Sequence, residues 1–171
     1  SPREPAAFEP AVRAILEADV VVLGPGSLFT SIIPNLLVPG ILAALRRTEA
    51  VKVYVCSMAD MQGETWGLTA EEYVDALLAH GLEGHLDVVL LHRPSNAGQG
   101  IATRRFQALT QEQVLDDAAR RARNLAPNVA ADPAPDWYFR PVQVSDEAVR
   151  RLEARVPLVI ARDFGDPERP T

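Results

Sequence analysis

The spacing of apolar residues along this chain changes repeatedly between two periods, and each change predicts a new strand or helix. Apolar residues in continuous or every-second runs indicate strands, whereas apolar residues three and four positions apart indicate helices. The first predicted strand, Val-Val-Val-Leu at residues 20–23, is apolar throughout, which is typical of a strand covered on both faces. Further strands are predicted at residues 51–56, 86–91, 141–144 and 156–161. Helices are predicted at residues 9–17, 32–37, 39–47, 69–80, 111–124 and 146–153.

Several helix starts carry residues that can satisfy the unpaired amides of a first turn. Thr69 and Glu72 have capping-box spacing, in which each side chain accepts a hydrogen bond from the other residue's backbone N–H. Pro39 suits a first turn because the N–H that it lacks would have no helical partner. Thr110 and Asp146 are the expected caps of the last two helices.

This order of elements predicts an α/β fold with a mostly parallel sheet and helices on both of its faces. The 171 residues are enough for one domain with its own core, so residues 1–171 are assigned to a single domain. Within it, residues 126–136 are predicted to form an internal loop and residues 165–171 a loose tail.

Composition restricts the classes of partner. The chain is 47% hydrophobic and 23% charged, as in ordinary soluble domains, and its net charge of −6 argues against a nucleic-acid or membrane surface. The single cysteine allows no internal disulfide, and no apolar run is long enough to span a bilayer, so we expect a cytoplasmic protein. Because the chain begins with Ser1 rather than Met, we expect it to be part of a longer polypeptide.

Ligands of open parallel sheets collect at the carboxyl ends of the strands, where three chemically unusual loops fall, at residues 24–31, 57–68 and 93–100. The first loop, Gly-Pro-Gly-Ser-Leu-Phe-Thr-Ser, combines glycines with hydroxyls between a strand and a helical segment. Free backbone N–H groups in such a turn can hold a phosphate. By pattern alone, an ordinary strand-to-helix turn with a capping hydroxyl fits equally well.

Charged and aromatic residues in the other two loops are further candidates. Arg93 follows a strand and could clamp a phosphate. Asp60 and Glu64 could be a carboxylate pair for acid–base or metal chemistry, although solvated loop acids are the commoner case. Trp66 could stack on a base or sugar ring, or cover the core.

Cysteine and histidine chemistry is not indicated. Cys56 ends a strand with no histidine evidently paired to it, so a small buried core residue is favoured over a nucleophile. His80, His85 and His92 lack ligand spacing, and no metal site is predicted.

Residues 23–40, from Leu-Gly-Pro-Gly-Ser-Leu through Pro-Asn-Leu-Leu-Val-Pro-Gly, resemble the bacterial gluconeogenesis-factor (YvcK-like) family. With 2-phospho-L-lactate transferase, that family makes up the CofD-like proteins. The resemblance continues through residues 53–56 and 63–65, and more weakly through 69–71 and 86–89. It covers the C-terminal half of the family pattern, because the Gly-Gly-Gly-Thr-Gly loop with which family members begin does not occur in this sequence.

The resemblance implies a Rossmann-like three-layer sandwich, of which this chain would be part, that binds a nucleotide or nucleotide sugar. UDP-N-acetylglucosamine is the ligand associated with the gluconeogenesis-factor branch. This chain departs from the family in its second loop, where Trp66 and Leu68 stand at positions that usually carry an acid and a phenol. The Asn-Val-Met-Thr-Gln that usually follows the cysteine is Ser-Met-Ala-Asp-Met here.

We therefore expect a nucleotide-sugar-binding regulatory protein that links carbon metabolism to cell-wall synthesis and cell shape, with no required cofactor. The alternative is a transferase of the 2-phospho-L-lactate transferase type that acts on a phosphate-activated small acid and uses Mg²⁺, with Asp60 and Glu64 as candidate catalytic residues. A third hypothesis is an assembly module that has lost its ligand. The sequence leaves open whether the protein forms a homo-oligomer. The expected ligand-binding residues are Gly24, Pro25, Gly26, Ser27, Leu28, Thr30, Ser31, Asn35, Ser57, Glu64, Thr65 and Arg93.

Overall fold

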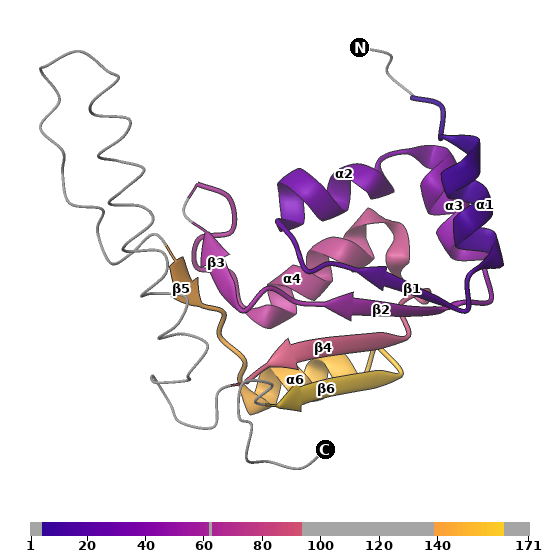
Figure 1. Ribbon diagram of the computed structural model, residues 1–171. Coiled ribbons are helices and arrows are strands. Elements are labelled where there is room, and N and C mark those ends of the chain that lie inside the picture. The colour runs from indigo at the N-terminus through magenta and orange to yellow at the C-terminus, as the bar shows by residue number, and fades with distance from the viewer. Residues whose placement is uncertain (1–4, 62, 94–138, 163–171) are drawn as a thin grey trace, which may run out of the picture.

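The structure, a computed structural model, describes residues 5–61, 63–93 and 139–162, and its centre is a four-stranded parallel sheet (Figure 1). The strand order is β1-β2-β4-β6, and each strand pairs in parallel with its neighbour. Both the α/β fold class and the parallel sheet are thus confirmed. The strands are β1 (Val20–Leu23), β2 (Val51–Val55), β4 (Val88–His92) and β6 (Leu158–Arg162).

The helices of the described residues lie on one face of this sheet, whereas the sequence predicted helices on both faces. The connections from β1 to β2, from β2 to β4 and from β4 to β6 each lead to the next strand in the same direction across the sheet. Right-handed crossovers of that kind place every connecting helix on the same side. Figure 1 shows α4 and α6 behind the strands, and α1 beside α3. The helical segments are α1 (Glu9–Glu17), η1 (Leu28–Ile32), α2 (Ile33–Leu36), α3 (Pro39–Arg47), α4 (Ala70–Leu77), η2 (Leu78–Leu82) and α6 (Asp146–Glu153).

The hydrophobic core lies between these helices and the sheet. Tyr54 of β2 and Val89 and Leu91 of β4 have no exposed surface, because side chains alternate along a strand and these three point toward the helices. Leu77 and Leu152 close the core from α4 and α6.

The opposite face of the sheet corrects one expectation. Val20 and Val22 of β1 are 52% and 54% exposed, so this strand is not covered on both faces as its apolar run suggested. A continuous apolar sequence shows that both faces suit burial, but it cannot show that a covering layer is present.

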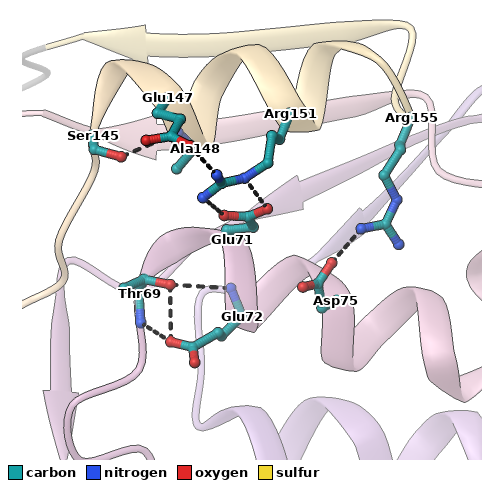
Figure 2. Close-up of polar contacts among 9 residues, drawn as sticks. All are labelled: Thr69, Glu71, Glu72, Asp75, Ser145, Glu147, Ala148, Arg151 and Arg155. Atoms are coloured by element: carbon teal, nitrogen blue, oxygen red, sulfur yellow. Dashed lines mark hydrogen bonds and ion pairs between the residues drawn. The ribbon is translucent and has the colours of Figure 1, made fainter.

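In the described residues, which do not include the predicted cap Thr110, helix caps follow the sequence with one exception. At α4, the Thr69 hydroxyl accepts a hydrogen bond from Glu72 N, and the Glu72 carboxylate accepts one from Thr69 N at 2.7 Å (Figure 2). The predicted capping box is therefore confirmed. At α6, the cap is Ser145, whose hydroxyl accepts from Ala148 N at 3.1 Å, and the predicted cap Asp146 is the first helical residue.

A second, two-stranded sheet differs from the prediction. β3 (Ala59–Met61) pairs antiparallel with β5 (Phe139–Pro141), whereas the sequence placed a strand at residues 141–144 and none at 59–61. Within the predicted range, Pro141 is the last residue of β5 and Gln143 forms an isolated bridge with Thr69. The helix predicted at 111–124, the loop at 126–136 and the tail at 165–171 lie outside the described residues.

Among the described residues, only a bent pair of helical segments reaches the length and composition of a membrane span. Within the described ranges no single helix is long and apolar enough to cross a membrane. Leu28–Leu36 and Pro39–Arg47 together reach that length and composition, but they are bent by 75° against each other.

Ion pairs fasten α6 to α4. The Arg151 guanidinium donates to both carboxylate oxygens of Glu71, at 2.7 and 2.6 Å, and Arg155 pairs with Asp75 one helical turn further on (Figure 2). The Arg151 guanidinium holds the pKa of the Glu71 carboxyl below its usual value.

Replacing Arg151 with methionine is expected to reduce stability at neutral pH and to flatten the loss of stability in acid. The pKa of Glu71 is lowered in the folded chain, so the pair stabilises above the ordinary pKa near 4.5 and is lost as pH falls through the lower folded value. Urea unfolding at pH 7 and pH 3 measures this: the difference between wild type and R151M should shrink at pH 3. R150M, which removes a charge that does not affect the Glu71 pKa, is the control. An equal difference at both pH values would contradict the pair's contribution.

Candidate functional site

The turn that follows β1 is held against the end of β2. Gly24 has a φ of +90°, a conformation that favours glycine, and a Cβ there would lie 2.7 Å from the backbone oxygen of Val55. The Gly24–Pro25 peptide bond is cis. Leu28 and Ile32 then insert into the core, with 0% and 7% of their surface exposed, and this fixes the direction of η1.

Three successive backbone amides in this turn have no hydrogen-bond partner among the described residues. They belong to Gly26, Ser27 and Leu28, and the first helical bonds, from Ser31 N and Ile32 N, both go to Ser27 O. The Ser27 side chain makes no capping bond either. Consecutive amides with a neighbouring hydroxyl are the donor set that an oxyanion uses. The sequence-predicted residues Gly26, Ser27 and Leu28 thus share one feature, an unpaired backbone donor.

The next two amides of the turn are already paired, with a carboxylate of the second loop. Glu64 Oε1 accepts hydrogen bonds from Phe29 N at 2.8 Å, from Thr30 N at 3.1 Å and from Thr30 Oγ1 at 3.3 Å. The other carboxylate oxygen, Oε2, is buried and has no partner within the part of the chain that the structure describes. In this structure Glu64 therefore occupies, with its own negative charge, two of the five amides of residues 26–30 in the turn that the sequence suggested for phosphate.

The loops after β1 and β2 do meet, as expected from their places at strand ends. Besides the Glu64 contacts, the Ser57 hydroxyl donates to Gly26 O at 3.3 Å. Arg93, at the end of β4, lies two strands from β1, roughly 10 Å away by ordinary strand spacing. Its guanidinium is paired with Asp146 at the start of α6, so its expected role as a phosphate clamp has no support from this arrangement.

Other predicted site residues bond within their own segments. Asn35 Nδ2 donates to Ser31 O at 2.6 Å, one turn back along the helical segment. Thr65 is 3% exposed, and its hydroxyl accepts from Met61 N at 2.9 Å. Pro25 is exposed beside Gly24.

A buried polar cluster lies beneath the two loops, and no local sequence pattern announced it. It consists of Tyr54, Cys56 and Tyr73, with Thr65 and Asp60 near Tyr73, and the buried Tyr54 hydroxyl has no hydrogen-bond partner among the described residues. Burial raises the pKa of the Cys56 thiol to about 12, and burial raises the pKa of Tyr73 to about 12 as well. A thiol that stays protonated at neutral pH is a poor nucleophile, in agreement with a core role for Cys56.

Asp60 and Glu64, the candidate catalytic pair, are each used to hold backbone. Asp60 is 2% exposed, and its carboxylate accepts from Gly67 N at 2.7 Å, whereas Glu64 binds the turn. Within the described ranges no group of three or more His, Cys, Asp and Glu side chains is arranged to hold a metal ion. Both carboxylates thus have a structural role, and these contacts give the Mg²⁺ of the transferase alternative no support.

A parallel sheet with an amide-rich turn at the carboxyl end of one strand defines the Rossmann-like class of α/β proteins. The family described as 2-phospho-L-lactate transferase CofD matches residues 1–133. This chain belongs to the CofD family, which confirms the resemblance seen in residues 23–40.

Relatives within the family carry a more specific name. The chain is 44% identical over 92 residues to the "Gluconeogenesis factor" of Halalkalibacterium halodurans, a match covering 54% of this chain and 29% of that protein. It is 38% identical over 124 residues to a "Putative gluconeogenesis factor" of Aquifex aeolicus, covering 71% of this chain and 37% of that protein.

A solved structure resembles almost the whole chain. It is a member of the UPF0052 family from Bacillus halodurans, with 30% sequence identity and a TM-score of 0.66, and the match covers 98% of this chain but 44% of that one. The chain thus spans less than half the length of these relatives.

Proposed function

We propose that this chain is the phosphate-holding part of a regulatory protein that binds a nucleotide sugar of the UDP-N-acetylglucosamine type. One observation carries the proposal: the amides of Gly26, Ser27 and Leu28, in succession at the carboxyl end of β1, have no partner among the residues that the structure describes. A diphosphate offers several negatively charged oxygens to such donors, and Gly26 has no side chain to keep them away.

In this proposal the diphosphate and the sugar or base of the ligand bind at different loops. The diphosphate binds at residues 26–28, with the Ser27 hydroxyl as a fourth donor. The loop at residues 57–68, joined to the turn through Ser57 and Glu64, faces the sugar or the base, and Trp66 supplies an aromatic ring for stacking. Binding of this kind requires no proton transfer, which agrees with carboxylates that hold backbone and a thiol that stays protonated.

The regulatory role rests on family membership. Relatives are named gluconeogenesis factors, and we propose that ligand binding lets this protein link carbon supply to cell-wall synthesis and cell shape. The donors at the turn support a phosphate-bearing ligand in general, and the choice of UDP-N-acetylglucosamine comes from the family resemblance.

Replacing Gly26 with valine is expected to weaken binding of UDP-N-acetylglucosamine by about tenfold or more, because two methyl groups would cover the amides that face the phosphates. Isothermal calorimetry with UDP-N-acetylglucosamine, GDP and inorganic phosphate, with and without Mg²⁺, measures this. G26A is the graded control, since its Cβ would meet Ser31 and Ile32 at ordinary distances of 3.7 and 3.9 Å.

The outcomes separate the hypotheses. Unchanged affinity in a folded G26V variant would contradict a phosphate site at the turn. Binding that appears only with Mg²⁺ would support the transferase alternative instead. Circular dichroism establishes that each variant is folded.

A further inference from the structure

The carboxylate of Glu64 is held in the turn after β1 in the way that an external anion would be held. Its Oε1 atom accepts hydrogen bonds from the backbone amides of Phe29 and Thr30, at 2.8 and 3.1 Å, and from the Thr30 hydroxyl at 3.3 Å. No lysine or arginine pairs with this carboxylate in the part of the chain that the structure describes. Backbone amides and a hydroxyl therefore balance its charge, and the same kinds of donor bind phosphoryl oxygens.

The contact satisfies only one of the two carboxylate oxygens. Oε2 of Glu64 is buried and has no hydrogen-bond partner among the described residues. A buried charged oxygen without a partner is unfavourable, because water no longer solvates it. Movement of the side chain into water would solvate both oxygens, and this offsets part of the loss of the hydrogen bonds to Oε1.

The Glu64 side chain can leave the turn without disturbing the loop that carries it. The amides of Glu64 and Thr65 donate to Met61 O, at 3.2 and 2.9 Å, and these backbone bonds do not involve the carboxylate. Thr65 is 3% exposed, and its hydroxyl accepts a hydrogen bond from Met61 N. Ser57 makes a separate contact between the two loops, to Gly26 O. Rotation of one side chain is therefore enough to free the amides.

Two sets of donors lie next to each other along the turn. The amides of residues 26–28 have no partner among the described residues, and those of residues 29 and 30 hold Glu64. A single phosphoryl group can bind the first set while Glu64 stays, but the two negative charges then repel each other at short range. A second phosphoryl group linked to the first can take the place of the carboxylate. The amides then keep a charged acceptor throughout the exchange.

We propose that Glu64 is an internal occupant of a second phosphoryl subsite, formed by the amides of Phe29 and Thr30 and the Thr30 hydroxyl. A ligand with two linked phosphoryl groups, such as a nucleoside diphosphate, displaces the carboxylate. A ligand with one phosphate binds beside it and is disfavoured by its charge. This inference rests on the proposed function, because residues 26–28 are the first subsite.

Calorimetry with pyrophosphate and with inorganic phosphate, on the whole chain and without added metal, tests the second subsite. Two variants separate charge from occupancy, because E64Q removes the charge but keeps an oxygen acceptor, whereas E64A removes both. With pyrophosphate, E64A is expected to bind about tenfold tighter than E64Q, because no side chain has to be displaced. With inorganic phosphate, the two variants should differ by less than about threefold, because one phosphoryl group fills the first subsite.

The outcomes distinguish failure of this inference from failure of the proposed function. If E64A and E64Q bind pyrophosphate equally tightly, or if E64A has the same advantage with both anions, Glu64 acts through its charge alone. The second subsite is then overturned, and the phosphate site at residues 26–28 stands. If G26V, shown to be folded by circular dichroism, binds pyrophosphate as tightly as the wild type, the proposed phosphate site itself is contradicted. Absence of binding of both anions, in the wild type and in E64A, would contradict both proposals.

Discussion

Replacing Gly24 with alanine is expected to lower the free energy of unfolding by about 2–4 kcal/mol. Two costs add at this position. The backbone has a φ of +90°, which an L side chain rarely adopts, and the new Cβ would lie 2.7 Å from the backbone oxygen of Val55. Backbone atoms at the end of a central strand cannot move away cheaply. Urea unfolding followed by circular dichroism measures the change.

Two other glycines separate these costs. Gly63 has a similar φ of +83° but open space around the position of a Cβ, so G63A carries the conformational cost alone, about 1 kcal/mol. Gly26 has no such φ and no close neighbour, so G26A should be nearly neutral. A loss in G24A no greater than that in G63A would contradict the close packing of the turn against β2.

Replacing Glu64 with alanine is expected to change stability and phosphate binding in opposite directions. The free energy of unfolding should fall by about 1.5–3 kcal/mol, because two backbone amides and a hydroxyl lose a charged acceptor. If the turn holds phosphate as proposed, affinity for inorganic phosphate should rise roughly three- to tenfold, because the amides of Phe29 and Thr30 become available and a negative charge leaves.

The variant E64Q tests the part that charge plays, since it keeps an oxygen acceptor at the same place. Its stability should lie near that of the wild type, with a smaller gain in phosphate affinity. E49A, which removes an exposed acid that makes none of these contacts, is the control for net charge. A fall in phosphate affinity in E64A would contradict this expectation and would indicate that Glu64 holds the turn in the conformation that binds phosphate.

The features that the sequence predicts well depend on neighbouring residues. The alternating apolar run of β2, the first-turn Pro39 and the box formed by Thr69 and Glu72 are each complete within a few positions. For this reason the order of strands and helices in the described residues is predicted well, and strand ends differ by one or two positions. The unpaired donors of residues 26–28 follow from the same local pattern of glycines and hydroxyls.

Features that join distant segments could not be predicted in this way. β3 has three residues, too few to show a period, and it exists through its pairing with β5 far along the chain. The hydrogen bond that Phe29 N donates to Glu64 joins residues 35 positions apart, and no local sequence pattern marks either partner. The exposure of Val20 and Val22 is a further case, because the two residues would have the same sequence whether or not another layer covers them.

The ion pairs between α4 and α6 join residues on either side of the connection between residues 94 and 138. Arg151 and Arg155 reach Glu71 and Asp75 directly, and β6 then pairs with β4 along five residues. Closing a longer connection costs only about 0.6 kcal/mol for each doubling of its length. A change in the length of this connection is therefore expected to cost little stability, because the contacts that hold β6 do not depend on its length.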